Sequence, residues 1–257
     1  MPPTRAKPTI SFIVPALNAQ AHIVPTVDAI LAVAKGRLPQ YEIILVDDGS
    51  TDGTGRVMDE LAAANPKIRA VHNERNLGLG GAYKRGLASA RCDYVMGVWG
   101  DNSMPVAGLA KIIDHVGTAD SVISYVVNFR EIKSPARHFG SRAYTGILNL
   151  LFGLHVSYYN GYAVHRADLL RSIDITSDGF GYQAEVILKF LGAGHSYVEV
   201  GVQSEAETSA SSALRPKNLL RVAKVLLHLI WKVPKFRRHA CPNYKAAQPT
   251  HSTMNQK

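Results

Sequence analysis

Two adjacent carboxylates at the end of an apolar segment are the residues best suited to chemistry in this 257-residue sequence. Residues 43–46 read Ile-Ile-Leu-Val, Asp47 and Asp48 follow directly, and a Gly-Ser turn leads to a helix start near Thr54. Ligands of open α/β sheets bind beyond the carboxyl ends of the strands. Carboxylates placed there can accept hydrogen bonds from a nucleobase N–H or from ribose hydroxyls. The competing interpretation, an Asx turn with a helix N-cap, applies best to Asp52 and Thr54.

A glycine-rich segment is the second candidate binding element. Residues 76–82 read Asn-Leu-Gly-Leu-Gly-Gly-Ala and follow the third predicted strand. Glycine lets a backbone approach a ligand closely before a helix begins, so Gly78 and Gly80 are candidate ligand contacts. Arg75 either pairs with a diphosphate or is an ordinary loop cation in solvent.

The elements that must position these residues alternate between strand-like and helix-like patterns. Strands are predicted at residues 10–14, 41–46, 68–71, 94–98, 121–126, 162–165 and 197–202. Helices are predicted at residues 23–34, 54–64, 80–90, 106–116, 137–154 and 182–191. Alternation of this kind favours βαβ units. The expected fold class is therefore α/β, with a Rossmann-like, mostly parallel central sheet flanked by helices.

Three segments together resemble a known family. They are Val-Pro-Ala-Leu-Asn at 14–18, Val-Asp-Asp-Gly-Ser-Thr-Asp at 46–52 and the glycine-rich segment at 76–82. The pattern resembles the inverting family 2 glycosyltransferases with the GT-A fold, and above all the polyprenyl-phosphate sugar transferases of the dolichol-phosphate mannose synthase type. The resemblance extends from about Ile10 to Leu220 and implies a GDP- or UDP-linked sugar donor. It implies donor contacts at Pro15, Leu17, Asn18, Asp47, Asp48, Arg75, Asn76, Gly78, Gly80 and Asp101.

The same resemblance implies a divalent metal, Mg²⁺ or Mn²⁺, held against the diphosphate after the fourth strand. Family members carry Asp-x-Asp there, whereas this sequence reads Trp99-Gly100-Asp101. Asp101 matches the second aspartate and is the one implied metal ligand and a catalytic candidate. A single carboxylate together with diphosphate oxygens can still hold Mg²⁺, which keeps several waters and uses few protein carboxylates.

Basic residues in the segment after the fifth strand correspond to acceptor contacts in the resembled family, in which the acceptor is a lipid phosphate. They are Arg130, Arg137, His138 and Arg142. A phosphate is already an anion, so it needs cations that orient it more than a general base. Arg137 and Arg142 are therefore catalytic candidates, and the spacing of His138 and Arg142 places both on one helix face. The alternative is that these charges are solvated or touch only a membrane surface.

Two further carboxylates are candidate bases or ligands for sugar hydroxyls. Asp178 and Glu185 lie in the segment Ser-Asp-Gly-Phe-Gly-Tyr-Gln-Ala-Glu at 177–185. The alternatives are a helix cap for Asp178 and an ordinary surface position for Glu185. Members of the resembled family also carry Arg-x-x-Gly-x-Ser-Lys after the last strand, and residues 205–213 lack its Arg, Gly and Lys. That diphosphate contact is either absent or shifted to Arg215 and Lys217.

The net charge of +9 belongs to the C-terminal segment. From Arg215 onward there are ten Lys or Arg and no Asp or Glu, which leaves 19 basic against 20 acidic residues in the remainder. Residues 218–233 are apolar apart from Asn218 and a stripe formed by Arg221, Lys224, His228 and Lys232. A stretch with fewer than ~18 uninterrupted apolar residues is too short to span a bilayer. It predicts an amphipathic helix on an anionic membrane surface, or one packed on the domain or on a second copy of the chain as a homodimer.

These patterns predict three regions: a transferase domain at 1–214, a basic amphipathic segment at 215–238 and a polar, disordered tail at 239–257. The expected location is the cytoplasm, peripherally on the inner face of the membrane, because no signal-like apolar segment precedes residue 10 and the two cysteines show no disulfide or metal spacing. The leading function is inverting sugar transfer to polyprenyl phosphate. Alternatives are transfer to a glycolipid or saccharide hydroxyl, which requires a base, and a nucleotide-sugar-binding module without catalysis. Nucleic acid is not an expected partner, because the basic tail lacks interleaved aromatic residues.

Overall fold

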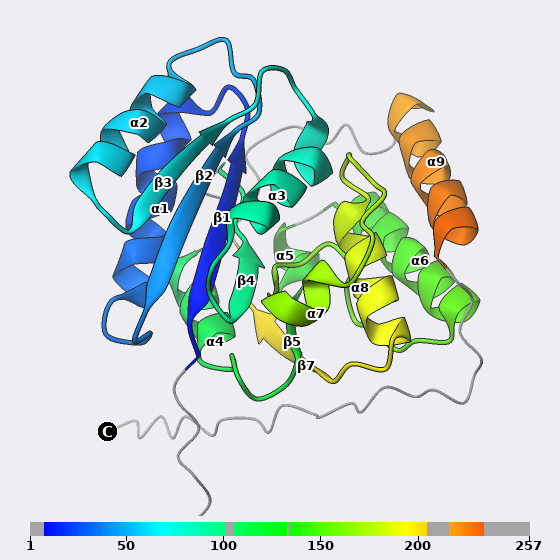
Figure 1. The fold of residues 1–257 in the computed structure, drawn as a ribbon. Helices are drawn as coiled ribbons and strands as arrows, with labels where there is room; N and C mark the ends of the chain where they lie inside the picture. Colours follow the sequence, from blue (N-terminus) through cyan, green and yellow to red (C-terminus); the bar gives the residue numbers. More distant parts are fainter. Residues whose placement is uncertain (1–7, 101–104, 133, 205–215, 234–257) are drawn as a thin grey trace, which may run out of the picture.

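The computed structural model describes residues 8–100, 105–132, 134–204 and 216–233. A seven-stranded sheet in the order β3-β2-β1-β4-β6-β5-β7 forms its centre (Figure 1). The strands are β1 (Ile10–Ala16), β2 (Tyr41–Asp47), β3 (Ile68–His72), β4 (Tyr94–Gly97), β5 (Ser121–Val126), β6 (Ala163–Arg166) and β7 (Tyr197–Val202). Neighbouring strands are parallel except at β6, which runs antiparallel to both β4 and β5. The expected mostly parallel sheet is confirmed.

Helices cover both faces of this sheet. They are α1 (Gln20–Ala34), α2 (Thr54–Ala64), α3 (Gly78–Ser89), α4 (Val106–Ile113), α5 (Phe129–Ile132), α6 (Pro135–Phe152), α7 (Ala167–Arg171), α8 (Tyr182–Gly192) and α9 (Pro216–Lys232). Phe12 and Val14 of β1 share a core cluster with α1, α2 and α4, whereas Ile13 packs with α3, α7 and α8. Because β1 is covered on both sides, its sequence is apolar at almost every position rather than alternating.

The predicted strands and helices are present with boundaries within three residues of those expected. Helix α6 begins earlier than expected because Pro135 suits the first turn of a helix, and it ends at Gly153, which has a left-handed φ of 67°. The short helices α5 and α7 were not predicted, since four or five residues carry no helical period. The antiparallel direction of β6 was not predicted either, because it depends on which strands become its neighbours.

Helix α9 packs one face on the domain. Leu229 and Val233 are buried in a cluster shared with α6 and α8. His228 Nε2 lies 3.0 Å from Thr176 Oγ1, so this histidine faces the domain and does not belong to a solvent-facing polar stripe. Among the described residues, no helix has both the length and the apolar character required to cross a bilayer. Residues 234–257, which include the predicted tail, lie outside the described residues.

Candidate active site

The carboxyl ends of β1, β2, β4 and β5 lie at one edge of the sheet. β1 is parallel to β2 and β4, and β5 has the same direction because the antiparallel β6 stands between β4 and β5. Such an edge is where open α/β sheets bind ligands. The predicted donor residues lie at or after the carboxyl ends of β1 to β4 in the sequence, and the predicted acceptor residues follow β5. The topology therefore brings the two groups to the same edge.

Side-chain hydrogen bonds join the loops after β1 and β2. Asn18 has a φ of 50°, a left-handed conformation that asparagine tolerates, and its Oδ1 accepts the Thr51 N–H at 2.9 Å. The Asn18 N–H donates to Ser50 Oγ at 3.0 Å. The Ala19 N–H donates to Thr54 Oγ1 at 2.9 Å. These bonds hold two loops, whose bonded residues are 32 to 35 positions apart in sequence, as one surface.

Asp47 is buried at the base of this surface. It accepts the Ser50 N–H at 2.9 Å, and its Oδ2 lies 3.2 Å from His72 Nδ1. The other ring nitrogen of His72 lies 2.9 Å from Asp59 Oδ1. Burial raises the pKa of Asp47, but hydrogen bonds from Ser50 and His72 outweigh it, so this pKa lies below its ordinary value. The Asp59 hydrogen bond, opposed by burial and assisted by Asp47, raises the pKa of His72 above its ordinary value.

This arrangement predicts a pH-dependent contribution of His72 to stability. A histidine whose pKa is raised on folding stabilises the protein fully below its unfolded pKa, and this stabilisation is lost as pH rises through the folded pKa. The melting temperatures of wild type and His72→Asn should therefore differ by roughly 2 °C at pH 6 and converge by pH 8. The difference is this small because the contacts of His72 with Asp47 and Asp59 are partly exposed and screened. The exposed His22→Asn is the control. A difference in melting temperature between wild type and His72→Asn that is constant across this pH range would refute the prediction.

Asp48 connects the end of β1 to the loop before α3. Its N–H donates to Ala16 O at 2.9 Å. Its Oδ1 accepts from Asn73 Nδ2 at 2.8 Å and from the Leu77 N–H at 2.9 Å. Within the described residues Oδ2 has no hydrogen-bond partner. One carboxylate oxygen thus joins the end of β2 to the loop before α3, and the other has no protein partner among the described residues.

The segment after β4 runs along the end of β1. The Gly100 N–H donates to the carbonyl oxygen of the buried Pro15 at 3.2 Å, while Leu17 beyond it is exposed. Trp99 is half-buried, with its ring centroid 4.4 Å from that of Tyr162. Asp101, the predicted metal ligand, lies outside the described residues. The described residues contain no group of three or more His, Cys, Asp or Glu side chains arranged to hold a metal ion.

The glycines of the 76–82 segment make room for protein backbone. A Cβ on Gly78, whose φ is 80°, would lie 2.5 Å from the carbonyl oxygen of Asp178. The Gly80 N–H donates to the same oxygen at 2.7 Å. The close approach expected at these glycines is therefore made by the 177–178 loop. Arg75 and Asn76, which precede them, are exposed next to Gly49, where any Cβ would meet the Arg75 backbone at 2.7 Å.

Asp178 is exposed, and its carboxylate pairs with Lys84 Nζ of α3 at 2.6 Å. The predicted helix cap is not formed, because no side chain caps α8. Through its carbonyl and its carboxylate, Asp178 ties the loop before α8 to the first turns of α3. Its role toward a sugar stays a prediction.

Glu185 is fully buried, which excludes the surface alternative. Its oxygens accept from Thr176 Oγ1 at 2.7 Å, from the Ser177 N–H at 2.8 Å and from Lys189 Nζ at 2.7 Å. Burial raises its pKa, but these hydrogen bonds prevail and lower the pKa to about 2. The catalytic role expected of Glu185 stays a prediction, and in this structure its carboxylate is buried and bonded within the protein. These bonds position the loop that contains Asp178.

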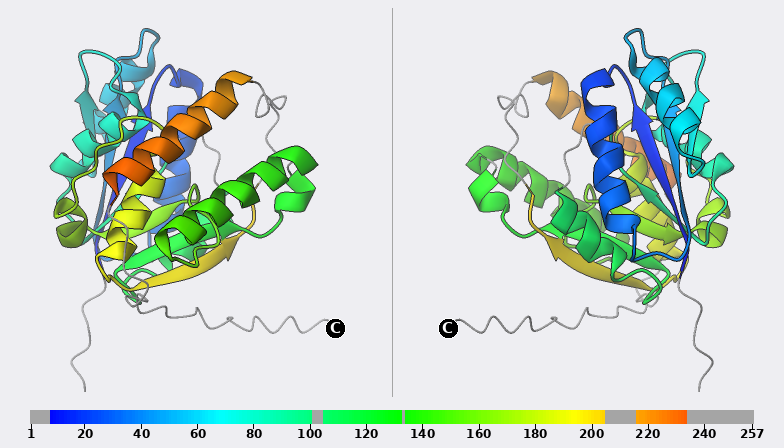
Figure 2. Two further views of the ribbon diagram at one scale, coloured as in Figure 1. Left: turned by 90° about the vertical axis from the view of Figure 1, so that its right-hand side faces the viewer. Right: turned by 90° about the vertical axis from the view of Figure 1, so that its left-hand side faces the viewer.

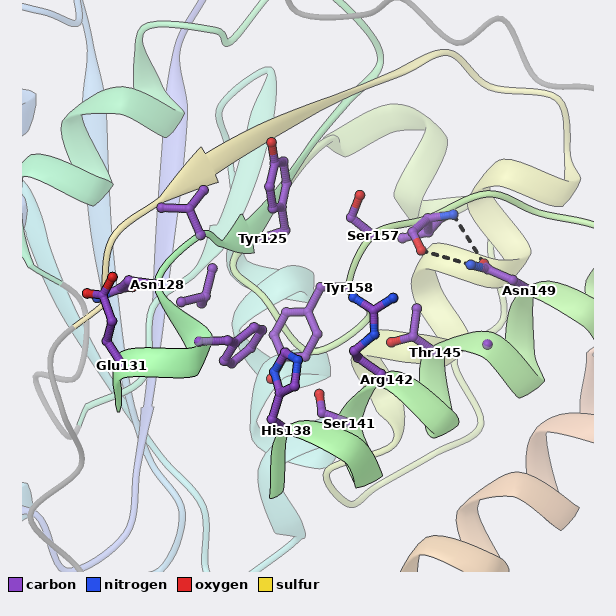
Figure 3. A pocket seen from close by; sticks show the side chains of 15 residues that line it. Tyr125, Asn128, Glu131, His138, Ser141, Arg142, Thr145, Asn149, Ser157 and Tyr158 are labelled. Atoms are coloured by element: carbon purple, nitrogen blue, oxygen red, sulfur yellow. Dashed lines mark hydrogen bonds between the residues drawn. The ribbon is translucent and has the colours of Figure 1, made fainter. Parts of the chain in front are cut away.

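A cavity of about 640 Å³ opens where β5 ends, between α5, α6 and the loop at 156–158 (Figure 3). Its wall is predominantly polar. The polar lining residues are Tyr125, Asn128, Glu131, His138, Ser141, Arg142, Thr145, Asn149, Ser157 and Tyr158. Behind this wall Asn149 Oδ1 accepts from the Val156 N–H at 3.1 Å, and Glu199 accepts from the Ser157 N–H at 2.6 Å. These bonds hold the 156–158 loop against α6 and β7.

Two of the predicted cations reach this cavity. His138 and Arg142 project toward it from one face of α6 (Figure 3). Among the described residues, Arg142 has no carboxylate partner, and the buried Nδ1 of His138 has no hydrogen-bond partner. A guanidinium without a carboxylate partner at a cavity wall is suited to a ligand with anionic oxygens. Arg137 is not among the residues that line the cavity, and the side chain of Arg130 is not described.

The cavity also contains residues that the sequence reasoning missed. Tyr125 and Asn128 come from the end of β5, and Ser157 and Tyr158 come from the loop after α6. The rule that ligands bind beyond strand ends could have identified the β5 pair. The 156–158 loop had no comparable signal, because its position depends on the contacts with Asn149 and Glu199.

Comparison with known proteins agrees with this architecture. Residues 11–188 match the model of glycosyl transferase family 2. Undecaprenyl-phosphate mannosyltransferase of Micrococcus luteus is 33% identical over 196 residues, which cover 70% of this chain and 81% of the relative. Polyprenol monophosphomannose synthase of Mycolicibacterium smegmatis is 33% identical over 178 residues, which cover 64% of this chain and 66% of the relative.

Solved structures are similar in fold at lower identity. Glucosyl-3-phosphoglycerate synthase from Mycobacterium tuberculosis, in complex with UDP, superposes with a TM-score of 0.64 at 21% identity and covers 88% of this chain and 81% of its own. Mannosyl-3-phosphoglycerate synthase from Rubrobacter xylanophilus gives 0.66 at 20% identity, covering 87% and 73%. The family match and the enzyme names of its relatives leave no support for a non-catalytic binding module. This chain belongs to glycosyl transferase family 2 and is a glycosyltransferase with the GT-A fold.

Proposed function

We propose that this enzyme transfers a sugar from a nucleoside diphosphate sugar to a polyprenyl phosphate. The observation that carries the proposal is the cavity with Arg142 and His138 in its wall, and this cavity lies at the same sheet edge as the Asp48 loop. A phosphate monoester is the ligand that a free guanidinium and an imidazole N–H recognise best. Two relatives at 33% identity are named for polyprenyl-phosphate mannosyl transfer, which supports the same acceptor class here.

The donor is proposed to lie over the loops after β1 and β2. Asp48 Oδ2 is available for a nucleobase or ribose donor group, and Asn18 and Ser50 shape the adjoining surface. The sugar would then extend toward Trp99 and the β5 cavity, because β4 stands beside β1 at this edge.

The reaction proposed is a single displacement with inversion at the anomeric carbon. A phosphate oxygen of the acceptor forms the new C1–O bond while the bond from C1 to the donor diphosphate breaks, and the nucleoside diphosphate leaves. The attacking oxygen is already ionised, so no protein base removes a proton. Arg142 and His138 would hold that phosphate in line with the bond that breaks, which is the main contribution required of the acceptor site.

A divalent cation would neutralise the charge that develops on the diphosphate. The chain offers few ligands for it, since Trp99 replaces the first aspartate of the family motif and Asp101 is the one carboxylate left. Glucosyl-3-phosphoglycerate synthase was solved with Mn²⁺ and UDP-glucose, which supports a metal in this fold. A one-carboxylate site should bind metal weakly until diphosphate oxygens complete it.

Calorimetric titration of Asp101→Asn tests this metal assignment. Wild type should bind the donor more tightly with Mg²⁺ or Mn²⁺ than without, and the variant should lose that stimulation while keeping its metal-free affinity. Asp93→Asn, at the opposite edge of the sheet, serves as the control. Equal stimulation in Asp101→Asn would remove Asp101 from the metal site.

The second candidate is transfer to a hydroxyl acceptor, and Glu131 favours it because this carboxylate lines the acceptor cavity. Product analysis separates the two functions. The enzyme is incubated with labelled UDP- and GDP-sugars and undecaprenyl phosphate. Label should move to a lipid from which mild acid releases the free sugar. A product that survives mild acid is a glycoside and would point to the hydroxyl acceptor instead.

A further inference from the structure

The four most exposed large apolar side chains of the described residues gather around two helices. Trp231 of α9 is 85% exposed, Leu150 and Phe139 of α6 are 77% and 74% exposed, and Phe180 is 77% exposed. Phe180 belongs to the loop on which α9 packs, because Val225 of α9 fills the space beside Gly181. Leu227 of α9 adds a further exposed apolar side chain.

The exposed side chains of α6 and α9 lie opposite the buried faces of these helices. Leu148 and Phe152 of α6, Leu229 of α9 and Val233, which follows α9, are buried in the same core cluster. Phe139 and Leu150 therefore stand on the outer side of α6, and Leu227 and Trp231 on the outer side of α9. Figure 2 (left) shows both helices lying across the side of the molecule that faces the viewer. We call the outer faces of α6 and α9 the apolar face.

The charge of these helices is of one sign. α6 and α9 contain no Asp or Glu. Lys224 and Lys232 are exposed on α9, and every charged residue from Arg215 to the C-terminus is a Lys or Arg. Apolar and tryptophan side chains surrounded by cations are typical of surfaces that enter the headgroup region of anionic membranes. A symmetric contact between two copies would instead bring like charges together.

We infer that the apolar face docks on an anionic lipid bilayer through both helices, so that α6 enters the interface together with α9. The role of this docking in catalysis rests on the proposed function, sugar transfer to a polyprenyl phosphate. Arg142 stands on α6 between the cavity and the outer row that contains Phe139 and Leu150. Docking through α6 would place the acceptor cavity beside the headgroups, so a lipid phosphate reaches Arg142 while its chain stays in the bilayer.

Flotation with vesicles of phosphatidylcholine and phosphatidylglycerol, without any polyprenyl phosphate, tests the inference. The wild-type chain should float with these vesicles, and less with phosphatidylcholine alone or in high salt. Phe139→Ser with Leu150→Ser should lower the partition coefficient by roughly tenfold for each side chain. Val24→Ser with Val106→Ser, two exposed apolar residues on α1 and α4, is the matched control and should float like wild type. Vesicles should also shift the Trp231 emission to the blue, measured as the difference from Trp231→Phe.

Three outcomes would overturn the inference. They are a wild-type chain that stays unbound, a Phe139/Leu150 variant that floats like wild type, and a variant whose main change is a smaller oligomer in sedimentation equilibrium. Donor binding by calorimetry verifies that the variant is folded. Arg142→Ala should float normally, so loss of lipid transfer with intact flotation reports on the acceptor site, and failure of docking is distinguished from failure of the proposed function.

Discussion

Replacing Arg142 by alanine is expected to lower kcat/KM for a polyprenyl phosphate by roughly 100- to 1000-fold. The Arg142 guanidinium has no carboxylate partner among the described residues, so it is available to a ligand. The described wall of the cavity contains no second arginine that could replace it. Arg142→Lys keeps the charge but loses the planar pair of donors, so it should retain an intermediate rate. Initial rates with undecaprenyl phosphate in detergent provide the measurement.

The control for Arg142 is Arg56→Ala on α2, which removes an exposed arginine paired with Glu60. It should leave the rate unchanged. The affinity for the nucleotide-sugar should be the same in Arg142→Ala, Arg142→Lys and Arg56→Ala. For the Arg142 variants the reason is that α6 lies on the acceptor side of the sheet edge. An Arg142→Ala enzyme that works within threefold of wild type would show that the phosphate binds elsewhere.

Changing Asp48 to asparagine is expected to weaken donor binding by roughly 10- to 100-fold, with little loss of stability. Asn73 and the Leu77 N–H are both donors to Oδ1, so they require an acceptor and fix the orientation of the new amide. The NH₂ group of the new amide then takes the place of Oδ2. A hydrogen-bond donor of the protein therefore faces the N–H or O–H groups of the nucleoside. Calorimetric titration with UDP- and GDP-sugars measures the effect.

Asp52→Asn is the matched control for Asp48. Its carboxylate accepts from Thr54 and from the Gln20 N–H within the protein, so the exchange should change donor affinity by less than about threefold. Equal losses in both variants would indicate a general disturbance of the loop. Unchanged affinity in Asp48→Asn would remove this carboxylate from the nucleotide site.

Local sequence was sufficient to predict much of this fold. The continuous apolar runs of β1 and β2 predict strands covered on both sides, and the observed sheet buries both. Asp52 accepts the Thr54 N–H at 2.9 Å, which confirms the Asx turn. The helix N-cap expected with it is not formed, because Gly53 precedes α2 and no side chain caps this helix. Both signals are local, because they depend on a residue and its near neighbours in the chain.

Local sequence could not predict the surroundings of residues whose partners lie far away in the chain. Glu185 and Asp178 belong to one short segment, yet the first is buried with a pKa of about 2 and the second is exposed beside Lys84. No pattern within residues 177–185 separates them, because the partners that distinguish them come from α3, α8 and α9. The glycines before α3 likewise accommodate the 177–178 loop, which follows about 100 residues later.

The order of residues along the chain therefore specified the strands, the helices and the acidic turn after β2. Tertiary structure decided which side chains share a site. The antiparallel β6 brings the end of β5 to the edge that carries Asp47 and Asp48, and α6 then turns His138 and Arg142 into one cavity. The physical reason is that strand formation depends on local burial and period, whereas a binding site depends on the direction and neighbours of strands that are far apart in sequence.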